Sequence, residues 1–291
     1  NTSSILNNQT DPNSGKQGFS PEGVGNPVEL LERMQAMQYR TQIFGNAALT
    51  FHLMKGLDLK TQFGIDYHNN RDANYTPFTP RPMINQKFRG SSFCQITTNY
   101  LLYWQEETYL TYVKDINKHH INAMAGMSWQ EYNYTKFEAS DSKYIDDFYG
   151  YYNLGSGTNR PSVGNDYDKW AMNSYFLRLA YSYDNKYMAT VTGRYDGSSK
   201  FGQNNKYAFF PSVGLGWMIS NEDFLKDNSL ISKLKLHTSY GLTGNSEIGT
   251  YKSLATVSQS NTIIGDALHV VSYLDNMPNP DLKWEKTGQW T

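Results

Sequence analysis

The chain alternates apolar and polar residues with a period of two over many segments, and this alternation restricts it to β-structure. In the segment 175–183, Leu177 and Leu179 share one face with tyrosines, while phenylalanine, arginine, alanine and serine occupy the other. The segment 187–195 alternates in the same way after the turn sequence Asp184–Lys186. Because successive side chains of a strand point to opposite faces, the two segments are predicted to form a hairpin with two unlike faces.

The same alternation recurs along the chain and predicts about nine strands, many of ten residues or more. Their connections through short turns indicate antiparallel pairing. The predicted strands lie near 43–53, 57–67, 99–113, 121–129, 175–183, 187–196, 213–219 and 234–242, and a last strand begins near 282.

The connections between these strands differ in length. Tight turns near residues 55, 116 and 185 alternate with long connections at about 69–95, 135–168 and 244–281. Alternate connections of an up-and-down sheet lie at the same end, so one end is predicted to carry tight turns and the other long loops. Residues 1–40 are expected to be a loop with a short helix, Val28–Met37, and a second short helix is expected at Glu222–Lys226.

Composition excludes several classes of protein. The chain of 291 residues has 26 Lys+Arg against 27 Asp+Glu, a balance that gives no general attraction for nucleic acid. No stretch of about 18 apolar residues is present, which excludes a transmembrane helix. The single cysteine, Cys94, excludes an internal disulfide framework and a multi-cysteine zinc site.

Aromatic residues occupy particular positions in the predicted strands. They make up 15% of the chain, and in the two clearest strands tyrosines bracket a centre of Leu, Ala or Val. Tyrosine suits a lipid–water boundary because its ring is apolar and its tip is polar, whereas aliphatic side chains suit hydrocarbon. The opposite face suits a wet lumen. The pattern favours an all-β, antiparallel, up-and-down transmembrane β-barrel segment over a soluble sandwich or propeller, whose core also needs alternation.

A series of motifs occupies the second half of the chain. It contains RYDGSSKFG at 194–202, NNKY at 204–207, LKLHTSYGLTGN at 234–245 and NPDLKWE at 279–285. This ordered series closely resembles the SusC/RagA family of TonB-dependent outer-membrane transporters of Bacteroidota. The resemblance covers about residues 26–291.

The resemblance implies an outer-membrane barrel of about 22 strands, plugged by an N-terminal domain. It also implies uptake of glycans or peptides, with a SusD-like surface lipoprotein as a lid and energy delivered through TonB. About nine strands do not close such a barrel. Residues 1–291 are therefore expected to be a partial barrel domain, with the plug domain and the closing strands absent.

Motifs for catalysis are absent from the sequence, which holds no HExxH, Walker-type or CxxC pattern and no nucleophile elbow. His119 and His120 are adjacent, so on a strand they point to opposite faces and do not easily share a metal. The same alternation separates Glu106 from Glu107 and leaves no fixed acid–base pair. We expect no catalytic site, no metal site and no cofactor.

The predicted loop Tyr134–Trp170 is the best place for solute contact. Its aromatic rings can stack on sugar faces, and its amides and carboxylates can bind hydroxyl groups. The alternative is that these rings pack the loop against itself or against a lid. The candidate residues are Tyr144, Asp146, Asp147, Phe148, Tyr149, Tyr151, Tyr152 and Arg160.

The sequence therefore predicts TonB-dependent uptake of a bulky polar nutrient, a glycan or peptide, across the outer membrane. The expected partners are a SusD-like lipoprotein, the TonB complex through parts outside this chain, membrane lipid and the solute, and no nucleic acid. One alternative is a soluble β-rich carbohydrate-binding module or glycan-degrading enzyme. Another is a barrel that anchors a surface assembly without transport. The soluble alternative requires Leu177, Leu179, Val191 and Leu215 to meet inside a dry interior.

Overall fold

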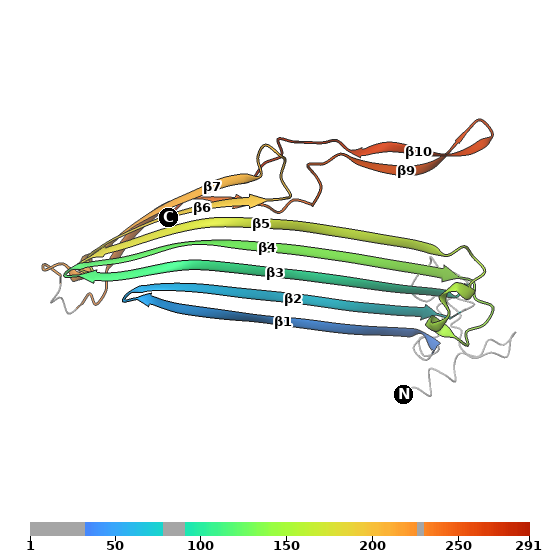
Figure 1. Ribbon diagram of the computed structural model, residues 1–291, viewed down its shortest axis with the longest axis horizontal. Coiled ribbons are helices and arrows are strands. Elements are labelled where there is room, and N and C mark those ends of the chain that lie inside the picture. The colour runs from blue at the N-terminus through green and yellow to red at the C-terminus, as the bar shows by residue number, and fades with distance from the viewer. Residues whose placement is uncertain (1–32, 78–90, 226–229) are drawn as a thin grey trace. The chain divides into compact units, whose positions relative to one another are not determined.

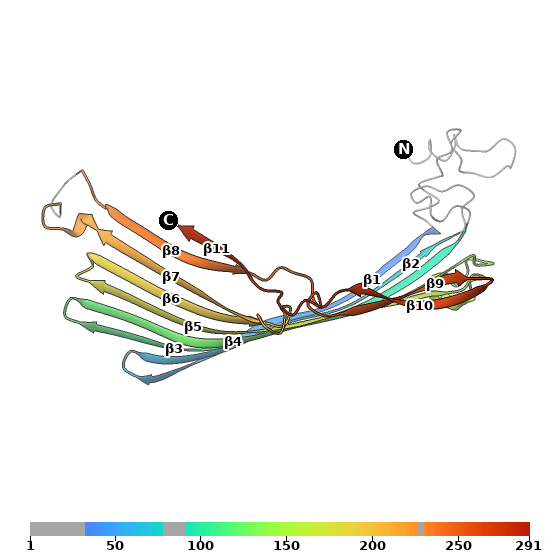
Figure 2. The same cartoon turned by 90° about the horizontal axis from the view of Figure 1, so that it is seen from above.

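The computed structural model describes residues 33–77, 91–225 and 230–291. Within these residues, nine strands form one sheet in the order β1-β2-β3-β4-β5-β6-β7-β8-β11, and β9 pairs only with β10. Strands β1 to β7 follow one another in chain order (Figure 1), and β8 and β11 come after β7 (Figure 2). The strands are β1 Gln35–Met54, β2 Leu57–Thr76, β3 Phe93–Ile116, β4 His119–Ser142, β5 Ser162–Tyr183, β6 Tyr187–Ser198, β7 Tyr207–Met218, β8 Lys235–Asn245, β9 Thr256–Ile264, β10 Ala267–Asn276 and β11 Glu285–Trp290.

This sheet confirms the predicted all-β, antiparallel class, and each of the nine predicted strands corresponds to one strand of the sheet. The register of the first predicted hairpin pairs Leu179 with Val191 and Tyr183 with Tyr187. On the next pair of strands, Val191 lies opposite Val213. The apolar positions of β5, β6 and β7 therefore share one face of the sheet.

The described chain divides into two compact units, and the long strands β1 to β5 contribute to both. The first unit contains the connection that follows β4. The second contains the tight turns and strands β6 to β11. The first unit lies within Asn1–Ile43, Tyr67–Leu101 and Tyr134–Tyr167, and the second consists of Phe44–Asp66, Leu102–Asn133 and Asp168–Thr291.

Hydrogen bonds join each tight turn of the second unit to the neighbouring strand or turn. Gly56, at φ 82°, accepts a bond of 2.7 Å from the amide of Val113. The carbonyl of Lys118 accepts a bond of 2.7 Å from Asp184, and the carbonyl of Lys186 accepts one of 2.7 Å from Met218. These bonds fix the position of each hairpin relative to the next one.

The strands extend farther toward the long connections than the alternation predicts. Strand β4 continues to Ser142 and β5 begins at Ser162, so the connection predicted at 135–168 is only 143–161. Strand β2 continues to Thr76, and β3 begins at Phe93. The apolar and polar alternation is weak in these extensions, and periodicity alone therefore predicted strands that are too short.

Both predicted helices need correction. Strand β1 begins at Gln35, so the loop expected over 1–40 and the helix expected at Val28–Met37 are wrong from that residue on; residues 1–32 lie outside the described chain. After a 3-10 turn at Ile219–Asn221, residues 222–225 form a turn rather than a helix, and Lys226 is not described. No helix in the described ranges is long and apolar enough to cross a membrane.

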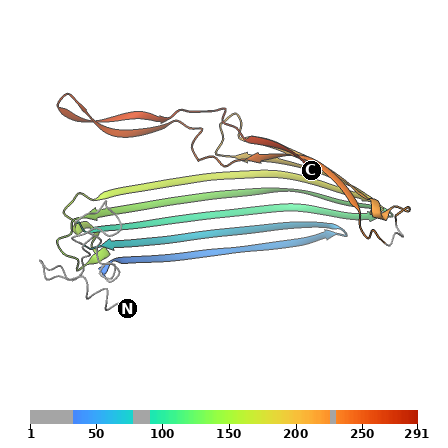
Figure 3. The same cartoon turned by 180° about the vertical axis from the view of Figure 1, so that it is seen from behind.

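A separate hairpin lies where a long loop, 244–281, was predicted. Strands β9 and β10 pair with each other around Gly265, where φ is 64°, and they appear as an orange-red pair in Figure 3. Ile263 and Leu268 face each other in this register and remain 73% and 70% exposed. The dipeptide Gly265–Asp266 between two alternating runs is a hairpin signal that would have predicted this pair.

Candidate functional site

One face of strands β5, β6 and β7 exposes its aliphatic side chains. The exposed fractions are 58% for Leu177, 45% for Leu179, 51% for Val191 and 57% for Leu215. In a soluble sandwich these side chains would fill the space between two sheets. Their exposure is instead the arrangement expected of a wall that faces lipid.

Aromatic residues border this apolar face at two levels along the strands. Beside the tight turns, Tyr187 pairs with Trp217 across β6 and β7, with ring centroids 6.5 Å apart and an angle of 13° between the planes. Toward the other ends of these strands, Tyr195 pairs with Phe209 and stacks on Tyr207 at 5.1 Å. Amphipathic rings on both sides of an aliphatic band are typical of the two boundaries of a membrane.

The opposite face of the same strands is largely half-buried, and it contains a buried polar cluster. Arg194 Nε donates to both carboxylate oxygens of Asp196 at 2.7 and 3.0 Å, and Arg194 Nη2 donates to Ser174 Oγ at 2.9 Å. Asp196 is only 8% exposed and Ser174 only 1% exposed. Arg194 and Asp196 therefore share this face, and their charges are paired within it.

A row of rings crosses the polar face of β3, β4 and β5. Tyr132 and Trp170 stack at 5.7 Å with an angle of 11° between the planes, and Tyr103 lies 6.3 Å from Trp170. The ammonium group of Lys200 lies 5.1 Å from the Trp170 ring centroid. These residues contact one another across the sheet, so the row stiffens the wall.

The motif at 279–285 contacts the motifs at 194–202 and 204–207. The amide of Gly202 donates to the carbonyl of Leu282 at 2.9 Å, and Asn204 Nδ2 donates to Asp281 Oδ1 at 2.9 Å. Trp284 Nε1 donates to the carbonyl of Lys206 at 3.0 Å. Trp284 also belongs to a buried cluster that contains Phe201, Ala208 and Phe210. The motif at 279–285 therefore holds the connection between β6 and β7 in place.

Glu222 joins two of the boundary aromatics beside the tight turns. Its Oε1 accepts hydrogen bonds from Tyr187 Oη at 2.6 Å and from Trp217 Nε1 at 2.9 Å, and Lys186 Nζ lies 3.2 Å from its Oε2. The hydrogen bond from Tyr187, followed by those from Trp217 and Lys186, lowers the pKa of the Glu222 carboxyl to about 2. The sequence pattern does not indicate this role, because it predicts a short helix at Glu222–Lys226.

Four of the candidate loop residues hold the connection 143–161 in place. Asp147 accepts a hydrogen bond of 2.5 Å from Tyr75 and pairs with Arg33 at 2.6 Å. Tyr144 donates through its hydroxyl to the carbonyl of Leu154 at 2.7 Å, and burial raises the pKa of this hydroxyl. The two remaining residues of this kind are Tyr151, which is 5% exposed, and Asp146, whose carboxylate accepts a bond of 3.0 Å from the amide of Phe148.

The other four candidates lie at the surface of the same loop. Phe148 is 83% exposed, Tyr152 is 77% exposed, Tyr149 is 57% exposed, and Arg160 is also exposed. Ile145, which is not among the candidates, is 89% exposed in the same loop. The loop thus combines an anchored base with an exposed aromatic surface, and the candidates divide between these two parts.

The histidine pair lies beside a tight turn, as its sequence position indicates. His119 Nδ1 lies 2.7 Å from the hydroxyl of Tyr181, and His120 Nδ1 lies 2.6 Å from the carboxylate of Asp115. The two rings therefore have different partners. Across the described ranges, no group of three or more His, Cys, Asp or Glu side chains is placed to hold a metal ion.

Comparison with known proteins agrees with this two-faced wall. The profile of the family described as "TonB dependent receptor-like, beta-barrel" matches residues 1–291. The protein "TonB-dependent receptor P3" of Formosa agariphila is 32% identical over 272 residues, which are 92% of this chain and 26% of that protein. "TonB-dependent receptor SusC" of Bacteroides thetaiotaomicron is 29% identical over 288 residues, 94% of this chain and 27% of that protein. The chain thus spans about a quarter of the length of the curated relatives it matches.

Two solved structures of similar proteins have the same fold as this chain. A structure described as that of the RagAB peptide transporter superposes with a TM-score of 0.81 at 27% identity, and covers 95% of this chain and 31% of that chain. The RagAB peptide importer in its "open-open" state gives a TM-score of 0.80 at 27% identity, with 96% of this chain and 31% of that chain covered. The family consists of outer-membrane receptors and transporters rather than enzymes. The family profile matches residues 1–291, and SusC and the RagAB structures are similar to the chain. The chain therefore belongs to the TonB-dependent receptor β-barrel family, as its motifs predicted.

Proposed function

We propose that this chain forms part of the wall and outer mouth of an outer-membrane importer that takes up a bulky polar nutrient, a glycan or a peptide. The observation that carries the proposal is the exposed aliphatic face between two aromatic levels, opposite a polar face that holds Arg194 and Asp196. The apolar face suits acyl chains, and the polar face suits a water-filled passage. The work of the protein is then binding and passage of the solute, without covalent chemistry.

The importer contains more strands than this sequence supplies. Within the described residues, β1 and β11 are the two ends of the nine-stranded order, and each has one edge without a neighbouring strand. In lipid each unsatisfied backbone group costs several kcal/mol, so the edges of a membrane sheet have to be paired. We infer that residues 1–291 are a part of the barrel domain, and that strands and a plug encoded outside this sequence complete it.

We infer the partners from the relatives named SusC and RagAB. The importer is coupled to TonB through parts outside this chain, and a SusD-like surface lipoprotein covers its mouth. The exposed aromatic surface of the loop 143–161, with Phe148, Tyr149 and Tyr152, supports contact with either the solute or the lipoprotein. The exposed surface depends on three residues that hold the loop in position, which are Asp147, Tyr144 and Tyr151.

A pair of adjacent substitutions in the full-length protein tests the membrane wall. Val191 is 51% exposed on the apolar face, and Thr190 lies on the opposite face, between Ala180 and Gly214 of the neighbouring strands. Val191→Arg is expected to cost about 2–4 kcal/mol in lipid and to abolish the heat-modifiable gel band of the inserted barrel. Thr190→Arg is expected to keep that band. Equal insertion of both variants would contradict the assignment of the faces.

Uptake tests the transport step. A strain that lacks the full-length gene is expected to lose growth on one glycan or peptide source and to regain it when the gene is restored. Phe148→Ala is expected to reduce uptake of that source while leaving the amount of inserted barrel unchanged. Normal growth of the deletion strain on every such source would favour a barrel that anchors a surface assembly without transport.

A further inference from the structure

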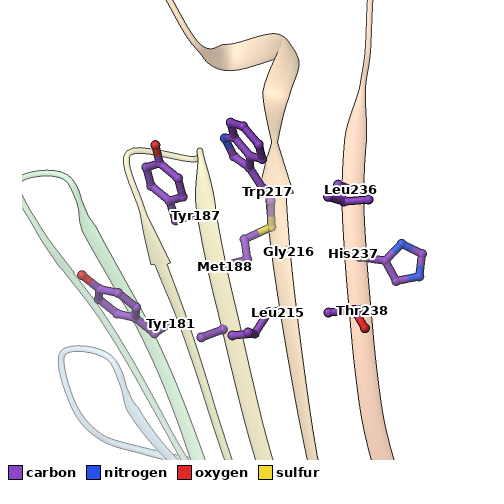
Figure 4. Close-up of a pocket in the computed structure, with 10 residues that line it drawn as sticks. Tyr181, Tyr187, Met188, Leu215, Gly216, Trp217, Leu236, His237 and Thr238 are labelled. Atoms are coloured by element: carbon purple, nitrogen blue, oxygen red, sulfur yellow. The ribbon is translucent and has the colours of Figure 1, made fainter. Parts of the chain in front are cut away.

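A groove of about 420 Å³ opens on the apolar face of strands β5 to β8, beside the tight turns. Figure 4 shows its lining side chains, with Tyr187 and Trp217 at the turn end and Leu215 farther along the strands. The surface inside the groove is almost entirely carbon. The groove is therefore suited to a hydrocarbon ligand and offers little to a polar one.

The register of three strands explains why a recess forms here. Ala189 lies opposite Leu215, which lies opposite Thr238, so small side chains flank the leucine on both sides. One pair closer to the turns, Tyr187 lies opposite Trp217, which lies opposite Leu236. Large side chains thus stand at the turn end of the face, and the small ones leave the space behind them.

Contacts from outside the groove hold its aromatic borders. Glu222 Oε1 accepts hydrogen bonds from Tyr187 at 2.6 Å and from Trp217 at 2.9 Å. On the β5 side, the hydroxyl of Tyr181 lies 2.7 Å from His119 Nδ1. A ligand that enters between these rings pays little for ordering them, because they are already fixed in position.

We propose that this groove binds one acyl chain of a phospholipid from the membrane leaflet on the tight-turn side. This inference rests on the proposed membrane location. Tyr187 and Trp217 mark the lipid–water boundary at that end, and the groove runs from them into the aliphatic band, as an acyl chain does from its headgroup. A flexible chain fits behind the rings without displacing them.

The charges around the groove indicate that the acyl chain, rather than the headgroup, is recognised. Lys186 Nζ is paired with Glu222 at 3.2 Å and with Asp223 at 3.7 Å. Lys118 Nζ is paired with Asp184 at 2.8 Å. Both ammonium groups already have carboxylate partners, so a lipid phosphate would have to compete with those carboxylates. Binding therefore depends on the shape and apolar surface of the groove.

Native mass spectrometry of the full-length protein, released from outer membranes in a mild detergent, tests the groove. The wild-type protein is expected to retain one phospholipid per barrel. Ala189→Leu fills the floor of the groove and is expected to lower the retained fraction about tenfold, which corresponds to about 1.4 kcal/mol. The control is Val191→Phe, which adds bulk to the same face of β6 outside the groove and is expected to retain the lipid.

The same spectra identify the occupant by mass after dissociation. Equal retention in Ala189→Leu and the wild type overturns the proposal, and so does a retained lipid A molecule or a second copy of the chain in place of the phospholipid. Heat-modifiable gel mobility is recorded first for each variant. A protein that is absent from the outer membrane contradicts the proposed function, whereas an inserted barrel with unchanged lipid retention contradicts only the groove.

Discussion

Tyr75 donates a hydrogen bond of 2.5 Å to Asp147 and so ties the end of β2 to the connection that follows β4. The tyrosine is only 1% exposed, and the carboxylate also pairs with Arg33 at 2.6 Å. Asp147 resembles a solute ligand in the sequence, but in the structure it is bound to the wall. The exposed positions of its neighbours Phe148 and Tyr149 follow from this attachment.

Tyr75→Phe is expected to loosen the loop 143–161. Removal of a hydrogen bond to a charged group costs about 1.5–3 kcal/mol, and the affected bonds lie within one loop, so the loop is expected to open locally. The amides of Gly150 and Tyr152 bond to the carbonyls of Asp147 and Tyr149 at 3.3 and 3.0 Å. Their hydrogen exchange is expected to accelerate by about tenfold or more.

Tyr149→Phe is the matched control for this exchange measurement. Tyr149 is 57% exposed, and its hydroxyl makes no hydrogen bond to the residues that the structure describes. The same chemical change there is expected to leave the exchange rates of Gly150 and Tyr152 unaltered. Equal acceleration by both substitutions would mean that Tyr75 does not anchor the loop.

Glu222→Gln is expected to destabilise the full-length barrel only above the acidic range. The pKa of Glu222 is lowered to about 2 in the folded protein, below its ordinary value of 4.5, so the ionised carboxylate favours folding above pH 4.5. This contribution declines as the pH falls toward 2. Thermal unfolding in detergent is therefore expected to give a lower Tm for the variant at pH 7, and a smaller difference from the wild type at pH 3. A pH-independent difference would contradict the ionic role.

Gly202→Ala is expected to separate the motif at 194–202 from the motif at 279–285. A Cβ atom at Gly202 would lie 2.1 Å from the carbonyl oxygen of Pro280, and this close contact with backbone cannot be relieved by a side-chain rotation. Overpacking of this kind costs about 1–3 kcal/mol, measured as a lower midpoint of unfolding in urea. The control is Gly155→Ala, where a Cβ atom meets nothing within 4 Å. Equal midpoints for the two variants would contradict this steric reading.

Arg194→Met is expected to leave the covered carboxylate of Asp196 without its cation. The expected loss is about 2–3 kcal/mol of unfolding free energy, because a largely buried charge then lacks its partner. Adding Asp196→Asn to this variant is expected to recover part of that loss, which a double-mutant cycle measures. Arg178→Met on β5 is the control, since Arg178 has no ion pair among the described residues. Additive effects at positions 194 and 196 would argue against the pairing.

The faces of the wall were predictable because they depend on a pattern that each strand carries by itself. The alternation places Leu177, Leu179 and Val191 on one face without any knowledge of neighbouring strands, and all three are exposed there. The turn Asp184–Lys186 then sets the register of β5 against β6. The outward and inward positions of this hairpin therefore follow from local sequence.

The roles of the loop residues depend on distant partners and were not predictable in the same way. The partner of Asp147, Tyr75, lies 72 positions earlier in the chain, and no local pattern connects the two residues. The role of Glu222 similarly depends on a distant partner, because Tyr187 lies 35 positions earlier in the chain. Candidate selection by residue type thus combined the exposed Phe148 and Tyr149 with the anchoring Asp147.

The bonds between successive turns have a consequence for the evolution of this wall. Because Lys118 holds Asp184 and Lys186 holds Met218, each turn serves as a template that positions its neighbour. An inserted residue in one of these turns would shift the register of the adjoining strand by one residue. Its apolar side chains would then lie on the polar face of the sheet. Insertions are therefore expected in connections at the other ends of the strands, such as 143–161, where added residues leave the registers set by these turns unchanged.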